Sequence, residues 1–260
     1  MEPFPTTSDL NADPDTMGEG HLWILEGVEG QPLRFSLRAD GRLVFETEHR
    51  RIDRDSADPA VRPAIGAVQS TFRRDAFRDA VEDVTTVTFY GVATCQHRIE
   101  YDWASLPAFV GFDIYSAATD GLLAPERTHA SFDRLGLTPA PAIDREVRAD
   151  TIRPDRFTFP ASKWADEPVA GVRLADKHGW RGRLDNPDRP KAPTASFRDA
   201  DAAAAALLND DLIDRIGTDD PVDDAVRALA RERRATLEAA GIAPQSDAFR
   251  AAVAELLGRR

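Results

Sequence analysis

Two alternating apolar segments that flank an Asp-Gly turn constrain the fold of this chain more than any other feature. Every second residue from Leu33 to Leu37 is apolar, and apolar residues return over residues 43–45, directly after Asp40-Gly41. Alternation places these side chains on one face of a strand, and Asp-Gly suits the tight turn between antiparallel strands. We therefore expect a β-hairpin here, as the start of an antiparallel sheet.

Further strand and helix patterns follow this hairpin up to about residue 185. Segments rich in β-branched and aromatic residues predict strands. Apolar residues at helical spacing predict helices over residues 61–72 and 125–135, and a shorter one near Phe77. Strands interleaved with helices indicate an α+β domain. The other expected strands span residues 22–25, 84–94, 108–115, 169–175 and 180–184.

The last quarter of the chain changes character after the proline-rich segment 186–196. Alanine, leucine and acidic residues then recur with helical period. We expect one helix from Ser196 to Ile216, a second from Asp220-Pro221 to Gly241, and a third near the end. The predicted organisation is a flexible N-terminal arm (residues 1–20), an α+β domain (residues 21–190) and a small helical C-terminal appendage (residues 195–260).

The chain is acidic throughout, with 45 Asp and Glu against 33 Lys and Arg and a net charge of -12. Acidic residues are spread over every segment and not gathered in a tail. Concentrated salt screens the repulsion between such charges over about 3 Å at 1 M, so the composition is typical of a halophilic protein. The acidic start of the chain and the lack of a long apolar run predict a cytoplasmic protein without a membrane partner.

Familiar catalytic motifs are missing from the sequence. It contains no GxxxxGK phosphate loop, no GxSxG elbow and no HExxH pair. Cys95-Gln96-His97 is predicted to lie on a strand with Cys95 and His97 on one face, but a metal site needs three or four ligands. We therefore predict a packed cysteine beside a surface histidine, and no metal site.

Five short motifs follow one another between about residues 20 and 190. In order and spacing they resemble the RNA ligase family of covalent nucleotidyltransferases, which carries Lys-x-Asp-Gly, aromatic-Gly-Glu, Phe-Asp-aliphatic, Glu-Gly and a basic strand. The segments HRIEYDW and FVGFDIY also look like halophilic members of that family. The resemblance implies a nucleotidyltransferase fold with ATP-grasp-like antiparallel sheets. The motifs here are Glu26-Gly27-Val28-Glu29-Gly30, Phe89-Tyr90-Gly91-Val92, Phe112-Asp113-Ile114, Ala170-Gly171 and Arg181-Gly182-Arg183.

The chain departs from the family at three motif positions. The resemblance implies ATP and Mg²⁺ as cofactors, and a lysine that forms a lysyl-AMP. Gly27 stands in place of that lysine, Val92 in place of a ribose-binding carboxylate, and Ala170 in place of a carboxylate associated with metal positioning. Losing the nucleophile and both carboxylates removes reactivity together with the electrostatics that support it. We predict a pseudoenzyme without catalytic residues.

The family positions that remain imply nucleotide and phosphate binding. Glu26 adjoins the lysine position, Phe112 would stack on adenine, and Arg183 stands where a lysine contacts phosphate. Arg50 and Arg51 follow the first hairpin, near where the family often places a phosphate-contacting arginine. Each also has a structural interpretation, because a strand aromatic is usually core and exposed arginines among acids are usually solvated.

Three functions remain open from the sequence. The first is a non-catalytic ligase homologue that binds a nucleotide or RNA ends, or acts beside an active ligase paralogue. The second is an active RNA ligase or nucleotidyltransferase with a displaced nucleophile, for which Lys163 and Lys177 are the lysines within the ligase-like region. The third is a protein-interaction module whose helical appendage carries the contacts.

Overall fold

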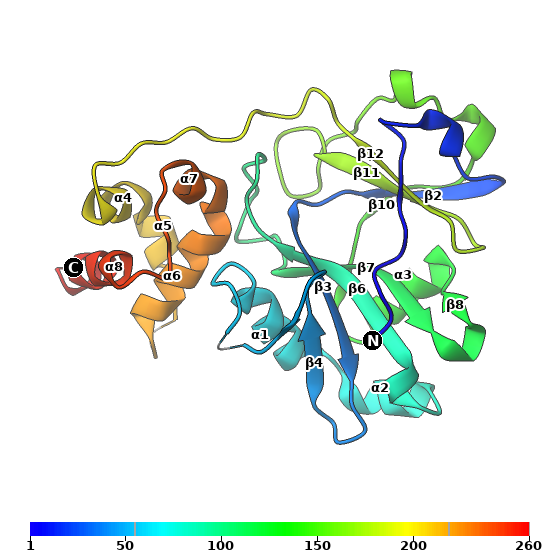
Figure 1. Cartoon of the computed structure of the whole chain (residues 1–260), viewed down its shortest axis with the longest axis horizontal. Coiled ribbons are helices and arrows are strands. Elements are labelled where there is room, and N and C mark those ends of the chain that lie inside the picture. Colours follow the sequence, from blue (N-terminus) through cyan, green and yellow to red (C-terminus); the bar gives the residue numbers. More distant parts are fainter. Residues whose placement is uncertain (55, 218, 260) are drawn as a thin grey trace.

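Two largely antiparallel sheets share one apolar layer in the computed structural model, which describes residues 1–54, 56–217 and 219–259 (Figure 1). One sheet has the order β1-β12-β11-β2-β10, and the other β5-β4-β3-β6-β7-β8, with β9 paired to β7. The α+β class with antiparallel sheets is confirmed. The strands are β1 (Ser8–Asp9), β2 (His21–Glu26), β3 (Gly30–Leu37), β4 (Leu43–Glu46), β5 (Arg51–Ile52), β6 (Val87–Thr94), β7 (Phe109–Ser116), β8 (Gly121–Leu122), β9 (Thr138–Pro139), β10 (Ala142–Arg148), β11 (Gly171–Ala175) and β12 (Arg181–Asp185).

The hairpin expected around Asp40-Gly41 is formed by β3 and β4. Phe35 lies opposite Phe45, and Gly41 turns the chain with a φ of 82°, a left-handed conformation that glycine adopts without strain. Phe35 also stacks on Phe89 of the neighbouring strand β6, with ring centroids 4.7 Å apart. The alternation in the sequence therefore fixes which face of this sheet is apolar.

Three helices cover that face of the β3-containing sheet. They are α1 (Arg62–Thr71), α2 (Arg74–Ala80) and α3 (Pro125–Arg134). Ile65, Phe77 and Phe132 from these helices are buried against the strands in one cluster. The opposite face of the sheet packs on the β2-containing sheet through residues such as Tyr90 and Trp23. Helices, sheet and second sheet thus form successive layers, with both sheet faces buried.

The first twenty residues pack along the α+β domain, where a loose arm was expected. Strand β1 pairs in parallel with β12, and Leu10 is buried beneath the outer face of the β2-containing sheet. The ring of Phe4 lies 5.6 Å from that of Tyr90. Because a short parallel pairing and two isolated apolar residues give no periodic signal, the sequence pattern did not indicate this docking.

The C-terminal residues form a helical bundle with its own core, joined to β12 by the extended segment 186–199 (Figure 1). Two of the expected helices are divided. The first starts after the cap Asp199, not at Ser196, and breaks where Asn209 caps a new helix. The second is interrupted at Arg233, whose φ of -127° is not helical. The helices are α4 (Ala200–Leu207), α5 (Asp210–Ile213), α6 (Pro221–Glu232), α7 (Arg234–Ala239) and α8 (Asp247–Gly258).

The bundle docks on the α+β domain through the end of α6. The Arg231 guanidinium donates to Thr94 O and Oγ1 and, at 2.6 Å, to Leu106 O. Arg231 O in turn accepts from the Gln96 amide at 2.9 Å. Arg231 is buried, so its hydrogen bonds are essential to satisfy the groups that it meets. The bundle is therefore held against the segment that connects β6 to β7.

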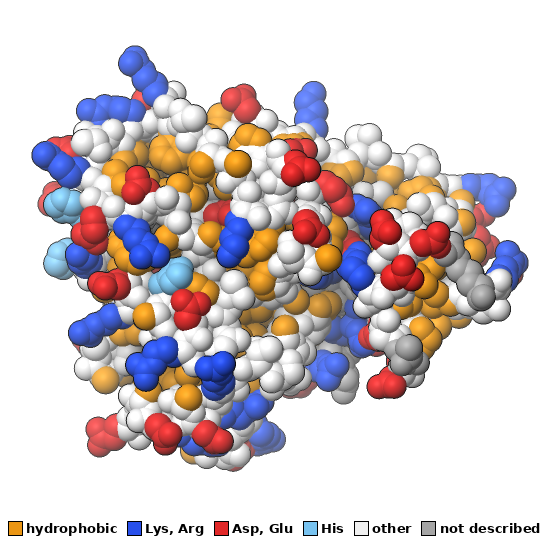
Figure 2. All heavy atoms as spheres, turned by 180° about the vertical axis from the view of Figure 1, so that it is seen from behind, with side chains coloured by type: hydrophobic (Ala, Val, Ile, Leu, Met, Phe, Trp, Pro, Cys, Tyr) orange, Lys and Arg blue, Asp and Glu red, His pale blue; other side chains and the backbone are white. Residues whose placement is uncertain are grey.

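Charged side chains of both signs are interspersed over the face that Figure 2 shows. Many are paired, as in the contact of Arg34 with Glu46 at 2.8 Å. In the part of the chain that the structure describes, no helix has the length and apolarity required to cross a membrane.

Candidate functional site

A cavity of about 420 Å³ opens where β2 ends and β3 begins, and we call it the Gly27 cavity. The three motif positions that depart from the RNA ligase pattern, Gly27, Val92 and Ala170, all line it, together with Arg183. These residues lie in the β2–β3 connection, in β6, directly before β11 and in β12, so segments far apart in sequence come together here. The remaining lining residues are Val28, Glu29, Gly30, Pro32, His97, Arg98, Gly171, Val172, Arg173, Asp185 and Arg189.

Backbone closes the wall of the cavity at Gly27. The Gly27 amide donates to Gly171 O at 2.9 Å. A Cβ built on Gly27 would lie 2.8 Å from that same oxygen, whereas ordinary contacts begin at 3.4 Å. A side chain at this position therefore requires β2 and β11 to move apart, because a strand backbone cannot yield as a flexible side chain does.

Glu29 organises the segment that forms one wall. Its Oε2 accepts from three consecutive backbone amides, those of His97, Arg98 and Ile99, at 3.1, 2.7 and 3.0 Å. Its own amide donates to the Tyr101 hydroxyl at 3.1 Å. A carboxylate bound by several amides is held strongly and has little remaining capacity for a ligand. Glu29 therefore holds the β6–β7 connection against the cavity.

Arginines dominate the charge of the Gly27 cavity. Arg98, Arg173, Arg183 and Arg189 line it, against the carboxylates of Glu29 and Asp185. Arg183 contacts Asp9 at 2.6 Å, and this hydrogen bond raises the pKa of the guanidinium. Arg189 contacts Asp185 at 3.4 Å. The cavity is therefore a local excess of positive charge in a chain of net charge -12.

Phe112 lies beside the Gly27 cavity, with an arginine over its ring. The Arg173 guanidinium carbon lies 3.8 Å from the Phe112 ring centroid, the geometry of a cation–π contact. The space left beside the ring is about 10 Å³, roughly enough for one water. Phe112 itself is only 8% exposed. The face expected to stack on adenine is therefore covered.

Glu26 points away from the Gly27 cavity and is not among its lining residues. Its carboxylate accepts from Ser162 Oγ at 2.5 Å and from the Lys163 amide at 3.1 Å. Burial raises the pKa of Glu26, against the opposing effect of these two hydrogen bonds. Glu26 is the last residue of β2, and Gly27 lies in the connection that follows it, so the two adjacent motif positions do not share one site. The structure thus gives Glu26 a tethering contact with residues 162–163.

The other predicted residues are also outside the cavity. Arg50, in the β4–β5 connection, and Arg51, at the start of β5, are both exposed, and neither lines the Gly27 cavity. Lys163 Nζ lies 5.1 Å from the Trp164 ring centroid, and Lys177 Nζ pairs with Glu146 at 2.9 Å. No lysine among the described residues lines the Gly27 cavity.

Cys95 and His97 follow β6 and are not on a strand, which corrects the sequence-based expectation. Cys95 is buried and His97 is exposed, with Sγ and Nε2 3.6 Å apart. Burial raises the pKa of the Cys95 thiol to about 12. Over the described residues, no group of three or more His, Cys, Asp and Glu side chains is placed to hold a metal ion.

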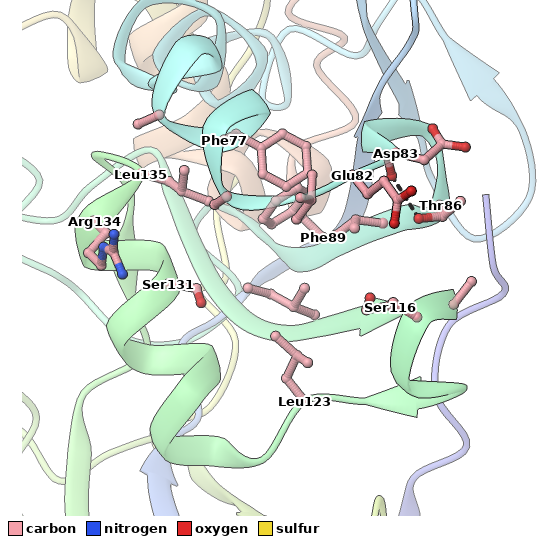
Figure 3. A pocket seen from close by; sticks show the side chains of 17 residues that line it. Phe77, Glu82, Asp83, Thr86, Phe89, Ser116, Leu123, Ser131, Arg134 and Leu135 are labelled. Carbon is pink, nitrogen blue, oxygen red and sulfur yellow. Dashed lines mark hydrogen bonds between the residues drawn. The ribbon is translucent and has the colours of Figure 1, made fainter.

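A larger cavity of about 710 Å³ lies on the other side of the β3-containing sheet (Figure 3). Phe77, Phe89, Leu123 and Leu135 give it an apolar floor between α2 and α3. Of the motif residues it contains Phe89 and Ile114, but none of the three positions that depart from the RNA ligase pattern and neither Arg183 nor Glu26. The Gly27 cavity, which the three departing motif positions line, is therefore the candidate functional site.

Comparison with known proteins gives matches among solved structures alone. No family model matches the chain, and no curated protein matches it. The Naegleria gruberi RNA ligase with PPi aligns over 72% of this chain and 56% of its own, at 12% identity and a TM-score of 0.51. A mutant of it with ATP and Mn reaches 0.53 over the same shares, and one with AMP and Mn reaches 0.52 at 13% identity. The chain has an RNA ligase-like nucleotidyltransferase fold. It spans a little over half the length of those ligase chains.

The RNA ligase-like domain does not fit the ATP and Mg²⁺ that its fold family implies. Gly27 offers no amine, and Val92 and Ala170 offer no carboxylate at the cavity wall. The one aromatic expected to receive adenine is covered by Arg173. The cavity therefore offers no side-chain set for chemistry on a nucleotide–metal complex among the described residues.

Sequence reasoning missed Arg98, Arg173 and Arg189. A signal for Arg173 was present, because it lies two residues after Gly171 on a strand and therefore on the same face. Arg173 is also directly opposite Arg183 in the β11–β12 register. Like charges in such a pair are unfavourable, which marks the position as unusual. Arg98 and Arg189 lie in connections with no periodic pattern.

Proposed function

We propose that this chain is an RNA ligase-like protein that forms no covalent nucleotide adduct and binds a nucleotide or an RNA end in the Gly27 cavity. The carrying observation is the backbone contact at Gly27, where Gly171 O takes the space that a nucleophilic side chain would need. Loss of both carboxylates at the same cavity supports the proposal. A regulatory role beside an active ligase paralogue, by occupying the same RNA ends, belongs to it.

The other two functions receive less support. An active enzyme with a displaced nucleophile requires a lysine at the cavity, but the ammonium groups of Lys163 and Lys177 contact Trp164 and Glu146. An interaction module that makes its contacts through the helical appendage would need an exposed apolar stripe, for which residues 221–240 are the candidate. Val226 and Leu229 of that stripe are instead buried inside the bundle.

The test is intact mass after incubation with ATP, and separately with GTP, in concentrated KCl with magnesium or manganese. We expect no mass increase, while a lysine-bearing RNA ligase treated in parallel gains a nucleotide. Binding of a fluorescent single-stranded RNA, followed by anisotropy, measures the second half of the proposal. A covalent adduct on this chain contradicts the first half, and absence of RNA and nucleotide binding contradicts the second.

A further inference from the structure

The side of the site that would receive a base is closed. Arg173 lies over the Phe112 ring, and the remaining space of about 10 Å³ is far smaller than a purine. The adjoining Gly27 cavity, at about 420 Å³, is in the range of small-ligand sites. A ligand therefore has room beside the guanidinium of Arg173 but not on the ring beneath it.

Two of the four cavity arginines have no carboxylate partner within ion-pair distance in the described part of the chain. Arg183 and Arg189 are paired with Asp9 and Asp185, whereas Arg98 and Arg173 have no such contact. The carboxylate of Asp113 is electrostatically close to Arg173, but Arg181 holds it at 2.7 Å. Two unpaired guanidinium groups thus line one small cavity.

The β-sheet register adds a reason for an anion at this position. Arg173 and Arg183 are directly opposite each other on β11 and β12. Like charges in opposite positions repel, and Asp9 forms an ion pair with Arg183 but not with Arg173. An anion in the cavity that Arg98 and Arg173 line would offset this positive charge, and guanidinium groups match phosphate oxygens with paired donors.

Among the described residues, the Gly27 cavity offers no set of ligands for a divalent metal. Glu29 is used by three backbone amides, and Asp185 is used by Arg189. Phosphate bound here must then be neutralised by protein cations. Because two arginines without a carboxylate partner line the same cavity, a doubly charged phosphate monoester suits it better than a singly charged phosphodiester.

We propose that the Gly27 cavity recognises a terminal phosphate monoester through Arg98 and Arg173, without a divalent cation and without contact to a base. This inference rests on the proposed function and specifies which part of the nucleotide or RNA end is bound. The monoester is at the end of an RNA strand or on a free mononucleotide, and competition distinguishes the two.

The experiment compares RNA oligonucleotides of one sequence that carry a 5′-phosphate, a 3′-phosphate or only hydroxyl ends. Binding is measured by anisotropy in EDTA and again in magnesium, with AMP, adenosine and inorganic phosphate as competitors. We expect a phosphorylated end to bind at least about tenfold more tightly than hydroxyl ends, since charge-assisted hydrogen bonds are lost without it. EDTA should not change this preference, and adenosine should not compete.

Arginine variants locate the effect. Arg98→Leu changes an exposed residue and should reduce the preference for a phosphorylated end about tenfold, as should Arg173→Leu. The matched control is Arg145→Leu, because the Arg145 guanidinium also lies over an aromatic ring, that of Trp23 at 4.6 Å, but outside the cavity. That variant should keep the full preference.

The outcomes separate this inference from the proposed function. RNA binding that ignores the terminal phosphate, requires magnesium or is displaced by adenosine overturns the inference and leaves the proposed function standing. The inference also fails if Arg98→Leu and Arg145→Leu behave alike. Strongest competition by AMP or free phosphate identifies a mononucleotide or phosphate ion as the source, and weak competition identifies the RNA end. No binding of any RNA or nucleotide overturns both proposals.

Discussion

Substitution of Gly27 by alanine tests whether the motif position is closed by backbone. The added Cβ would be 2.8 Å from Gly171 O, about 0.6 Å short of ordinary contact, and relief requires β2 and β11 to separate. Overpacking typically costs about 1–3 kcal/mol, and weakening the hydrogen bond between Gly27 and Gly171 costs about 1 kcal/mol more. Because the unfolded chain has less conformational entropy with alanine than with glycine, the substitution also stabilises the fold by about 0.4–1 kcal/mol. We expect Gly27→Ala to lower the free energy of unfolding by about 1–3 kcal/mol.

Urea unfolding in concentrated KCl measures this change. The four tryptophans, Trp23, Trp103, Trp164 and Trp180, all precede the helical bundle, so their fluorescence reports on the RNA ligase-like domain. Gly66→Ala is the matched control, because a Cβ at this site in α1 meets nothing closer than 3.9 Å. It should stabilise the domain by about 0.5–1 kcal/mol.

The two alanine variants should therefore differ in sign. A Gly27→Ala protein as stable as its parent refutes the closed-backbone reasoning. Gly27→Lys extends the test to chemistry, because the restored amine still lacks the carboxylates replaced by Val92 and Ala170. We expect no adduct from it with ATP and magnesium, and adduct formation would show that the cavity retains ligase geometry.

Four further predictions concern stability. Arg231→Met should weaken docking of the bundle by about 3–5 kcal/mol, because Thr94 O and Leu106 O lose the guanidinium that donates to them. Protease cleavage within residues 186–199 should then be faster than in the parent protein. Burial raises the pKa of Glu26 above its usual 4.5, so the stability that Glu26 contributes at low pH is lost as pH rises through the folded pKa. Above that pH, Glu26→Gln should therefore be more stable than the parent protein, as measured by urea titrations. Asp113→Asn leaves Arg181 buried without its carboxylate and should cost about 3–5 kcal/mol, seen as a lower urea midpoint. If the acidic surface is a salt adaptation, the unfolding temperature should rise between about 0.2 and about 2 M KCl, and a fall would contradict it.

The sequence predicted the parts of the fold whose faces differ in polarity. The β3–β4 hairpin and the buried strands β6 and β7 carry alternation or continuous apolar runs, and their positions follow within two or three residues. Strand β10 was missed because it is an edge strand whose residues are mostly exposed and charged, so neither face is apolar. Edge strands of this kind form through backbone pairing, which leaves little trace in side-chain pattern.

The candidate site was predictable only in its outline. Gly27, Val92 and Ala170, which the sequence motifs single out, line one cavity, because the arrangement of the strands determines which positions meet. The orientation of Glu26 and the arginine over Phe112 depend on contacts with residues more than 60 positions away. Such long-range contacts follow from packing, and a single sequence does not encode them as a local pattern.

The lone cysteine of the chain is located at the seam between its two parts. Cys95 packs with Ala60 of the RNA ligase-like domain and Ala230 of the bundle, and its thiol is fully buried. A thiol reagent can reach it only when α6 lifts away or the domain opens locally, so the labelling rate measures how often that happens. The native cysteine thus reports how often the bundle separates from the RNA ligase-like domain, without an introduced probe. Slower labelling in the presence of a phosphorylated RNA end would show that a ligand in the Gly27 cavity makes separation of the bundle from the domain less frequent.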